Sequence, residues 1–328
     1  MRILSRGDLE RLLAPRDVIE AVEAAFAVSA AGRADVPART SIEIGRDGVL
    51  LSMPALVNDD AGRGEGLGSK LVSVYPDNRA RGHPTVYATY ILMDGATGQP
   101  LAVLEATYLT ALRTGATSAV AARRLARPES RHVTCFGAGV QAEFQLRCLH
   151  AVLPVERISV VGRDPARARR FAEAMCRRLG VPVEVANDSR AAVRAADVVT
   201  CATTACEPVV FGADLSEGSH VDLVGAFRPT DREADSEAIR KARVVVDTYA
   251  GALAEAGDIV IPMKEGVIAR EHVAAELAEI VTDARPGRTR ADEITVFKSV
   301  GWALEDLAAA RLAYNRARAA NIGTEVSL

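Results

Sequence analysis

One short segment in the middle of the chain has the residue types that hold a dinucleotide. Gly137-Ala138-Gly139-Val140-Gln141-Ala142 follows an apolar run, residues 132–136, that indicates a strand, and it opens a stretch typical of a helix. The first glycine of such a G-x-G-x-x-A pattern makes a tight turn, and the second lets the backbone approach a pyrophosphate. The small third residue lets the helix pack on the strand, with its N-terminus facing the anion. The pattern in this context predicts a nicotinamide dinucleotide site.

The end of the next predicted strand, residues 157–161, bears on which dinucleotide is bound. An acidic residue there accepts hydrogen bonds from the ribose 2′-OH, whereas an arginine accommodates a 2′-phosphate. Gly162 stands where the acidic residue is expected, and Arg163 follows it. The sequence therefore favours NADP(H). NAD(H) stays open, because Arg163 is also explained as a solvated arginine and Asp164 as the N-cap of a helix that begins at Pro165.

Three basic residues stand in segments that are otherwise poor in charge: Arg39, Lys70 and Arg113. Lysine is scarce here, with four lysines among 40 basic residues, so a lysine in an apolar run is unlike ordinary surface composition. Fixed cations of this kind bind the α-carboxylate of a small amino or imino acid, and arginine offers two parallel hydrogen bonds. We expect Lys70 and Arg113 to act on a substrate more than on stability, so that methionine variants of both keep the fold.

The elements that position these residues fall into two groups. Short strand patterns at residues 40–44, 49–53, 67–74, 85–93 and 101–104 predict a mainly antiparallel sheet, and a helix follows at 107–126. Beyond it, strand and helix patterns alternate, which is typical of a doubly wound parallel sheet of the Rossmann type. A helical tail at 302–320 is expected to pack on the first domain. We predict an α/β protein with a substrate-binding and dimerisation domain at 1–113 with 300–328 and a dinucleotide-binding domain at 114–299.

Composition excludes several other classes of protein. Forty basic against 43 acidic residues give a net charge of −3, and 4% of the residues are aromatic, so nucleic acid is not an expected partner. No apolar run reaches the roughly 20 residues of a membrane span. The first residues are charged and do not resemble a signal peptide, so a cytoplasmic location is expected. The five cysteines lack a Cys-x-x-Cys pair and the five histidines are scattered, so no metal site is expected.

Six strings along the chain resemble the ornithine cyclodeaminase/mu-crystallin family over nearly its whole length. They are Gly68-Ser69-Lys70-Leu71-Val72 with Pro76-Asp77-Asn78, residues 92–98, residues 111–116, residues 136–142, residues 224–229 with Arg232-Glu233, and residues 297–301. The resemblance implies a homodimer formed through the smaller sheet domain. It also implies that Arg39, Lys70 and Arg113 hold the substrate carboxylate, with Lys70 near the reacting centre as the catalytic candidate. The positions implied to line the cofactor, together with those of the dinucleotide pattern, are Thr85, Arg113, Gly137, Ala138, Gly139, Val140, Gln141, Arg163, Thr203, Val224, Gly225, Ala226 and Ser299.

One string departs from the cyclodeaminating members of that family. They resemble Val-Gly-Gly-Asp where this chain has Val224-Gly225-Ala226-Phe227, and a phenyl ring cannot accept the proton that the aspartate is expected to handle. The string resembles ketimine reductases instead, which implies an NAD(P)H-dependent reductase of cyclic ketimine carboxylates or a related amino-acid dehydrogenase. An ornithine cyclodeaminase, with Asp231 replacing the missing carboxylate, and a non-enzymatic NADPH-holding protein like mu-crystallin remain the alternatives. Asp231 is more simply explained as a turn residue after Pro229-Thr230.

Overall fold

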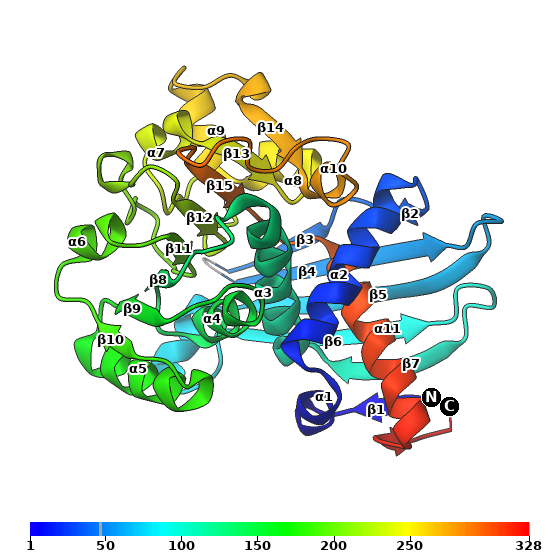
Figure 1. Cartoon of the computed structure of the whole chain (residues 1–328). Coiled ribbons are helices and arrows are strands. Elements are labelled where there is room, and N and C mark those ends of the chain that lie inside the picture. Colours follow the sequence, from blue (N-terminus) through cyan, green and yellow to red (C-terminus); the bar gives the residue numbers. More distant parts are fainter. Residues whose placement is uncertain (46–47, 328) are drawn as a thin grey trace. The chain divides into compact units, whose positions relative to one another are not determined.

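The computed structural model describes residues 1–45 and 48–327, and the backbone alone of Arg79. The chain divides into two compact units (Figure 1). Unit 1 comprises Met1–Arg113 and Trp302–Leu328, and unit 2 comprises Thr114–Gly301. The boundary after residue 301 falls two residues beyond the one expected after 299. The boundary after Arg113 lies inside α3 (Ala106–Leu125).

Unit 1 is built on an eight-stranded sheet in which every strand pair is antiparallel except β1 with β7. The order is β16-β1-β7-β6-β5-β4-β2, with β3 also paired to β4. The strands are β1 (Arg2–Leu4), β2 (Ala34–Asp35), β3 (Thr40–Ile44), β4 (Gly48–Asn58), β5 (Gly64–Val74), β6 (Val86–Met93), β7 (Pro100–Glu105) and β16 (Thr324–Glu325). The mainly antiparallel sheet expected from the sequence is confirmed.

The expected strand at 49–53 is too short, because β4 continues through Pro54 to Asn58. Proline normally argues against a strand interior, since it cannot donate a ladder hydrogen bond. β3 pairs with residues 48–52 of β4 and β2 pairs with 56–57, so Pro54 falls at the gap between these two partners. The missing N–H therefore removes no ladder bond to β2 or β3, and on its other edge Pro54 pairs with Ser69 of β5.

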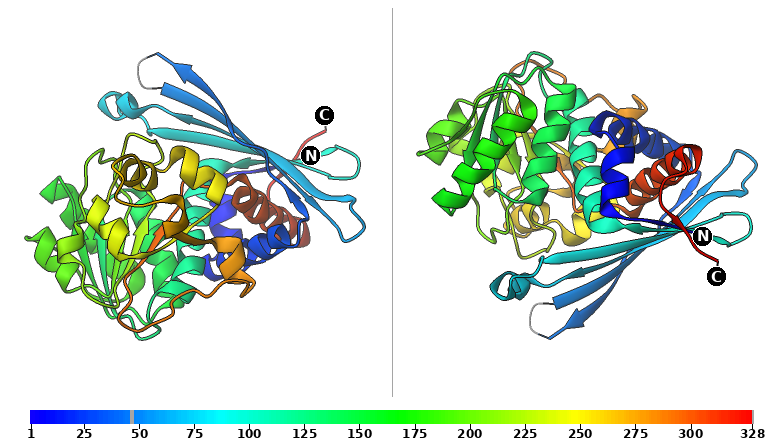
Figure 2. Two further views of the ribbon diagram at one scale, coloured as in Figure 1. Left: turned by 90° about the horizontal axis from the view of Figure 1, so that it is seen from above. Right: turned by 90° about the horizontal axis from the view of Figure 1, so that it is seen from below.

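One face of the unit 1 sheet is covered by helices and the other is open. α1 (Arg6–Leu12), α2 (Pro15–Ala30) and α11 (Ala303–Ala320) pack together, and α11 contacts β4, β5 and β6 (Figure 2). This confirms that the C-terminal helix returns to the first domain. Buried positions alternate along β4 and β5, as expected for strands with one covered face.

Unit 2 holds an eight-stranded parallel sheet in the order β10-β9-β8-β11-β12-β15-β13-β14. Its strands are β8 (His132–Phe136), β9 (Arg157–Val161), β10 (Val183–Val185), β11 (Val198–Cys201), β12 (His220–Leu223), β13 (Arg243–Val246), β14 (Val273–Glu276) and β15 (Thr295–Lys298). Helices and short 3₁₀ turns connect them: α4 (Val140–Val152), α5 (Pro165–Leu179), α6 (Ser189–Arg194), α7 (Ser236–Lys241), α8 (Tyr249–Glu255), α9 (Gly257–Lys264) and α10 (Leu277–Val281). The doubly wound parallel sheet is confirmed.

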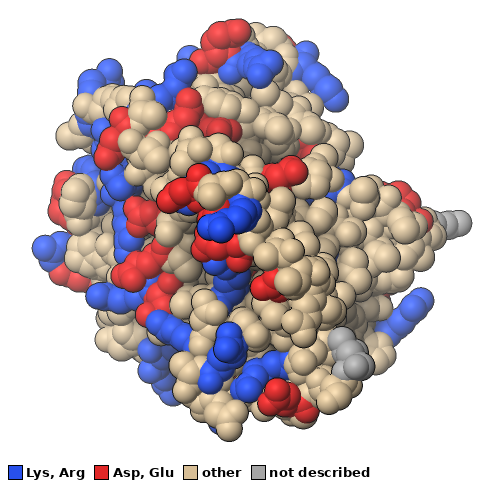
Figure 3. All heavy atoms as spheres, turned by 90° about the vertical axis from the view of Figure 1, so that its right-hand side faces the viewer, with Lys and Arg blue, Asp and Glu red and all other residues tan. Residues whose placement is uncertain are grey.

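The surface carries no single-sign charged area on the face drawn in Figure 3, where basic and acidic side chains are interspersed. This fits the near balance of 40 basic and 43 acidic residues. Within the described ranges, none of the helices has the length and apolar character needed to cross a bilayer.

Candidate active site

The glycine-rich segment lies where the strand order of the parallel sheet reverses. β8 has β9 on one side and β11 on the other, and ligands of doubly wound sheets bind at the carboxyl ends of strands at such a point. Gly137 follows β8 with a φ of 118°, a conformation that favours glycine. A Cβ at Gly137 would also lie 2.6 Å from the Ala202 carbonyl oxygen at the end of β11. Both the backbone conformation and the close carbonyl oxygen therefore require glycine at this position.

The N-terminus of α4 is open to an anion. Its N-cap is Gly139, so no side chain caps the first turn of the helix. Val140 at the first helical position is 54% exposed, although it is apolar. These features are those of a pyrophosphate cradle, and the residues present fit a nicotinamide dinucleotide.

Two arginines lie near this cradle. Arg163 is exposed after β9, and no hydrogen bond or ion pair to it is seen among the described residues. Asp164 caps α5 by accepting from the Ala166 and Arg167 N–H groups, at 2.9 and 3.2 Å. The Arg167 Nε donates to the Ala138 carbonyl oxygen at 2.9 Å, which places a cation on the glycine-rich segment. The sequence reasoning missed Arg167, because it lies inside an arginine-rich helix.

A buried glutamate ties together the segments that follow β11 and β12. Glu233 Oε1 accepts from the N–H and the hydroxyl of Thr203, at 2.8 and 2.7 Å. Its Oε2 accepts from the Gly225 N–H at 2.7 Å and from the Ala226 N–H at 3.4 Å. Burial raises the pKa of Glu233. Three predicted cofactor-lining residues are therefore held by one carboxylate that the sequence analysis assigned no role.

Two further buried carboxylates support the same edge of the sheet. Lys298 donates to the Ala226 carbonyl at 2.5 Å and lies 2.8 Å from Asp258 Oδ2. Ser299, a predicted cofactor contact, donates its hydroxyl to Asp247 Oδ2 at 2.9 Å. That oxygen also accepts from the Val300 and Gly301 N–H groups. The segment after β15 is thereby fixed beside the segments held by Glu233.

In unit 1, two of the three predicted cations come together in a buried group, which we call the substrate cluster: Lys70, Arg113, Glu305 and Asp306. Lys70 Nζ lies 2.7 Å from Asp306 Oδ2, and Arg113 Nε lies 2.9 Å from Asp306 Oδ1. Arg113 Nη1 lies 2.6 Å from Glu305 Oε2. Lys70 is 1% exposed and Arg113 4%.

The surroundings shift the pKa values of the two cations in opposite directions. Burial, together with the nearby Arg113 charge, lowers the pKa of Lys70 from 10.5 to about 8. Burial would also lower the pKa of Arg113, but the Asp306 and Glu305 carboxylates outweigh it and raise that pKa. Lys70 is therefore the one member of this cation pair that exchanges a proton near neutral pH.

The glycines before Lys70 make room for its neighbours on the inner face of β5. A Cβ at Gly66 would lie 2.7 Å from Arg311 Cδ of α11, and one at Gly68 would lie 2.5 Å from the Tyr90 hydroxyl. Tyr90 pairs with Lys70 across β5 and β6, and its buried hydroxyl has no hydrogen-bond partner in the described part of the chain. The Gly-x-Gly-x-Lys spacing thus brings a lysine and a tyrosine hydroxyl to one buried face.

Comparison with known proteins identifies the family. The ornithine cyclodeaminase/mu-crystallin family model matches residues 1–321. The chain belongs to this family. It is 36% identical over 328 residues to a Δ1-pyrroline-2-carboxylate reductase of Bacillus cereus, with 99% of each chain covered. A Thermococcus litoralis Δ1-pyrroline-2-carboxylate reductase, solved in complex with NADH and L-proline, is 46% identical with a TM-score of 0.96, over 99% of this chain and all of that one. An archaeal alanine dehydrogenase dimer with bound NAD is 34% identical with a TM-score of 0.93, covering 100% and 99%.

In this family member the residues that bear on cyclodeamination lie in unit 2. Phe227 is half-buried after β12 and provides no side-chain base. Asp231 lies in a turn in which its N–H donates to the Arg228 carbonyl, and its carboxylate accepts from the Thr230 hydroxyl at 2.9 Å. These contacts are those of a turn residue.

The remaining predicted contacts stay predictions. Arg39 is half-buried on the segment that joins β2 to β3, and Thr85 is half-buried just before β6. Val224 and Gln141 are half-buried at the carboxyl end of the unit 2 sheet and in the first turn of α4. Within residues 1–45 and 48–327, no group of three or more metal-ligating side chains is found.

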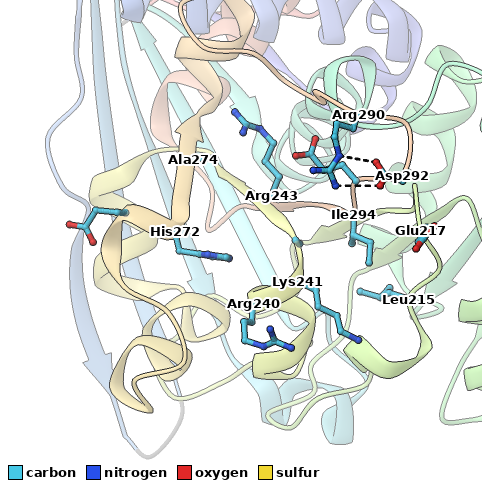
Figure 4. Close-up of a pocket in the computed structure, with 13 residues that line it drawn as sticks. Leu215, Glu217, Arg240, Lys241, Arg243, His272, Ala274, Arg290, Asp292 and Ile294 are labelled. Atoms are coloured by element: carbon cyan, nitrogen blue, oxygen red, sulfur yellow. Dashed lines mark hydrogen bonds and ion pairs between the residues drawn. The ribbon is translucent and has the colours of Figure 1, made fainter.

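A cavity of about 740 Å³ lies at the other end of the parallel sheet (Figure 4). It is lined near the amino ends of β13 and β15 by Arg243 and Ile294, and by Lys241 and His272. Arg290 at its rim is already paired with Asp292, at 2.9 Å. Acidic and basic lining residues balance, and the cavity lies at the opposite strand ends from the glycine-rich cradle. We therefore assign it no part in catalysis.

Proposed function

We propose that this protein is an NAD(P)H-dependent reductase of cyclic ketimine carboxylates, of the Δ1-pyrroline-2-carboxylate or Δ1-piperideine-2-carboxylate type. The carrying observation is the substrate cluster, in which a buried lysine and arginine are held by α11 on the inner face of β5 and at α3. A reductase of this kind also needs a binding site for a nicotinamide dinucleotide, and the glycine-rich cradle of unit 2 fits that need. Relatives of at least 34% identity that are named as reductases or dehydrogenases of imino and amino acids support the assignment.

The chain's own residues position the substrate and supply charge. Lys70 and Arg113, with Arg39, hold the carboxylate, and Lys70 acts next to the imine carbon as the catalytic residue. A bound nicotinamide supplies the hydride. These residues would hold the substrate with its imine nitrogen protonated, so that the electron pair of the C=N bond ends on a neutral amine nitrogen when the imine carbon is reduced. The barrier falls chiefly because the reactants are held in place and the carboxylate is neutralised.

The test is a steady-state assay of cyclic imines of different ring size with both reduced dinucleotides, together with the reverse oxidation of the corresponding amino acids. Reduction of a five- or six-membered cyclic imine carboxylate, above the rate with an open-chain 2-oxo acid and ammonia, is expected. Turnover of the open-chain pair alone would instead favour an alanine dehydrogenase type of activity.

For the cofactor we propose a preference for NADPH. Arg163 is exposed and unpaired within the described ranges, and Gly162 has no carboxylate to hold a 2′-OH. A side chain at Gly162 would have its Cβ 3.0 Å from the Ala168 Cβ, so an acidic residue is not easily accommodated. The solved relatives named above carry NADH or NAD. The proposal fails if kcat/KM for NADH equals or exceeds that for NADPH, and Arg163→Ala is expected to lower NADPH use selectively.

Cyclodeamination is the second candidate activity, since a lysine cyclodeaminase is 31% identical to this chain with a TM-score of 0.88, covering 100% of this chain and 95% of that one. Phe227 argues against it, and Asp231 is held in a turn. We expect little or no ammonia and proline from ornithine with added NAD. Robust ammonia release that Asp231→Asn abolishes would show that the base has moved to Asp231. A non-enzymatic NADPH-holding role would show as tight NADPH binding without turnover of any imine.

We propose a homodimer formed through the open face of the unit 1 sheet. Cross-strand neighbours place Ile42, Leu71 and Tyr87 on that face, and they are 61%, 41% and 48% exposed. Exposed apolar side chains gathered on one sheet face mark an interaction surface. We also place the protein in the cytoplasm, whose reducing conditions suit its free cysteines.

A further inference from the structure

The first turn of α5 packs closely against the glycine-rich segment. Asp164 fixes the start of this helix, because its carboxylate accepts from the Arg167 N–H at 3.2 Å. Small residues let the two segments approach: a Cβ at Gly162 would lie 3.0 Å from the Ala168 Cβ and 3.8 Å from the Ala138 Cβ. Side chains of a helix point back toward its N-terminus, so Arg167 reaches the loop that follows β8.

The guanidinium of Arg167 borders the second glycine of the G-x-G-x-x-A pattern. Its Nε donates to the Ala138 carbonyl oxygen at 2.9 Å. A Cβ at Gly139 would have Arg167 Nη2 as its nearest neighbour, at 3.5 Å. The missing side chain of this glycine is what lets the backbone approach a pyrophosphate. The far end of the guanidinium thus lies beside the space in which a pyrophosphate is expected.

The side chain of Arg167 forms no ion pair with any described residue. Backbone N–H groups, that of Arg167 first, and then the charges of Arg170 and Arg167 lower the pKa of Asp164, whose carboxylate serves as the cap of α5. Glu143, in the first turn of α4, lies 2.7 Å from Arg178 Nη1. Apart from its Nε bond, the half-buried guanidinium of Arg167 meets no hydrogen-bond acceptor in the described part of the chain. Its two Nη groups therefore remain as donors for a phosphate group.

We propose that Arg167 binds the pyrophosphate of the dinucleotide and that it acts equally on NADPH and NADH. The inference rests on the proposed function, because it takes a nicotinamide dinucleotide to lie on the glycine-rich segment. Arg163 has a different place, since it follows Gly162 after β9, where the ribose 2′ position is expected. Both dinucleotides carry the same pyrophosphate, and the 2′-phosphate distinguishes them. Arg167 thus sets the affinity for either cofactor, and Arg163 sets the choice between them.

The experiment titrates NADPH and NADH into the purified protein by isothermal titration calorimetry. Arg167→Met keeps the length of the side chain and removes its charge. It should weaken both dinucleotides by the same factor, on the order of tenfold, because a charge-assisted hydrogen bond to the pyrophosphate is lost. The ratio of the two dissociation constants should stay that of the wild type. Arg163→Met should weaken NADPH alone and so change that ratio.

Two smaller ligands separate a direct contact with the pyrophosphate from a change in the shape of the loop. ADP carries a diphosphate and no 2′-phosphate, whereas 2′-AMP carries a 2′-phosphate and no diphosphate. In competition with NADPH, Arg167→Met should weaken ADP and leave 2′-AMP unchanged, and Arg163→Met should do the reverse. Arg167→Lys keeps the charge, so it should recover part of the ADP affinity. The matched control is Arg177→Met, an exposed position in the last turn of α5, which should change neither.

The outcomes separate the inference from the proposed function. Wild-type affinity for both dinucleotides in folded Arg167→Met overturns the inference, and Arg167→Gln serves if the methionine variant does not fold. A loss confined to NADPH and 2′-AMP also overturns it, because Arg167 would then bind the 2′-phosphate. An equal loss for ADP and 2′-AMP overturns the direct contact and shows a distorted loop. A wild type that binds neither dinucleotide loses the proposed function and the inference together, whereas one that binds both and reduces no imine loses the function alone.

Discussion

Replacing Lys70 by methionine tests two consequences of the substrate cluster at once. The change removes the cation 2.7 Å from Asp306 Oδ2 and leaves that buried carboxylate with Arg113 Nε at 2.9 Å. Breaking a buried ion pair costs roughly 3–5 kcal/mol when one charge is left uncompensated. Because Arg113 remains, we expect a loss of about 3 kcal/mol in the free energy of unfolding. The ion pair thus adds a stability cost to the expectation that a methionine at this position keeps the fold.

A second substitution separates stability from function. In Lys70→Met with Asp306→Asn, Arg113 and Glu305 remain as a neutral pair, so most of the lost stability should return. The charged hydrogen bond to the substrate carboxylate does not return. Its loss should cost about 2–4 kcal/mol of transition-state stabilisation, hence roughly 30- to 1000-fold in kcat/KM, in the single and the double variant alike.

The assay pairs urea unfolding with the kinetics of imine reduction. Lys241→Met is the control, since Lys241 is 36% exposed and pairs with Glu237 on the surface of α7. The reasoning is refuted if the double variant regains near-normal kcat/KM together with its stability, because Lys70 would then only have offset Asp306. An unchanged free energy of unfolding in Lys70→Met would refute the claim that the pair of Lys70 with Asp306 stabilises the fold.

Three further outcomes are expected. Because the pKa of Lys70 is lowered to about 8 from 10.5, the ammonium loses its proton as the pH rises through 8, so kcat/KM should fall above about pH 8. Lys70→Arg should move that fall to higher pH, and an unmoved fall would assign it to another group. Over the same window, from about pH 8 to 10.5, the unfolded chain binds more protons at Lys70 than the folded one, so the contribution of Lys70 to stability becomes more favourable as the pH rises. Glu233→Leu should weaken NADPH binding at least tenfold in a fluorescence titration, since Thr203 and Gly225 lose their shared acceptor. Glu233→Gln should weaken it less, because its amide oxygen still accepts from one of the two segments, and wild-type affinity in the leucine variant would contradict the role of Glu233. Leu71→Glu on the open sheet face should convert dimer to monomer in light scattering, and an unchanged mass would place the interface elsewhere.

The fold was predictable wherever apolar residues recur at the spacing of a single kind of element, either a strand or a helix. The strands at 132–136 and 157–161 and the start of a helix at Pro165 were expected, and the structure shows each of them there. The strand predicted for β4 ended too early, because a proline such as Pro54 normally argues against a strand. Only the structure shows that Pro54 falls between the residues of β4 that pair with β3 and those that pair with β2. Short elements such as α6 and β14 were missed, since six or four residues carry too little pattern to distinguish them from loops.

The parts of the site that consist of residues adjacent in the sequence were predictable. The glycine-rich cradle is such a part, and the scarcity of lysine singled out Lys70. The partners of these residues were not predictable. Glu305 and Asp306 open a helix, where acidic residues normally complement the helix dipole at the surface, and only the topology brings them against residues far earlier in the chain. Glu233 gave no separate signal, because its role depends on two strand ends meeting around it.

Isotope transfer tests the reductase assignment most directly. NADPH carrying two deuterium atoms at C4 of the nicotinamide is incubated with Δ1-pyrroline-2-carboxylate and the purified protein, and the product is analysed by mass spectrometry and NMR. We predict proline of a single configuration with one deuterium on Cα, and no label elsewhere. Proline without deuterium at Cα, or no proline while the dinucleotide stays bound, would contradict direct hydride transfer to the imine carbon.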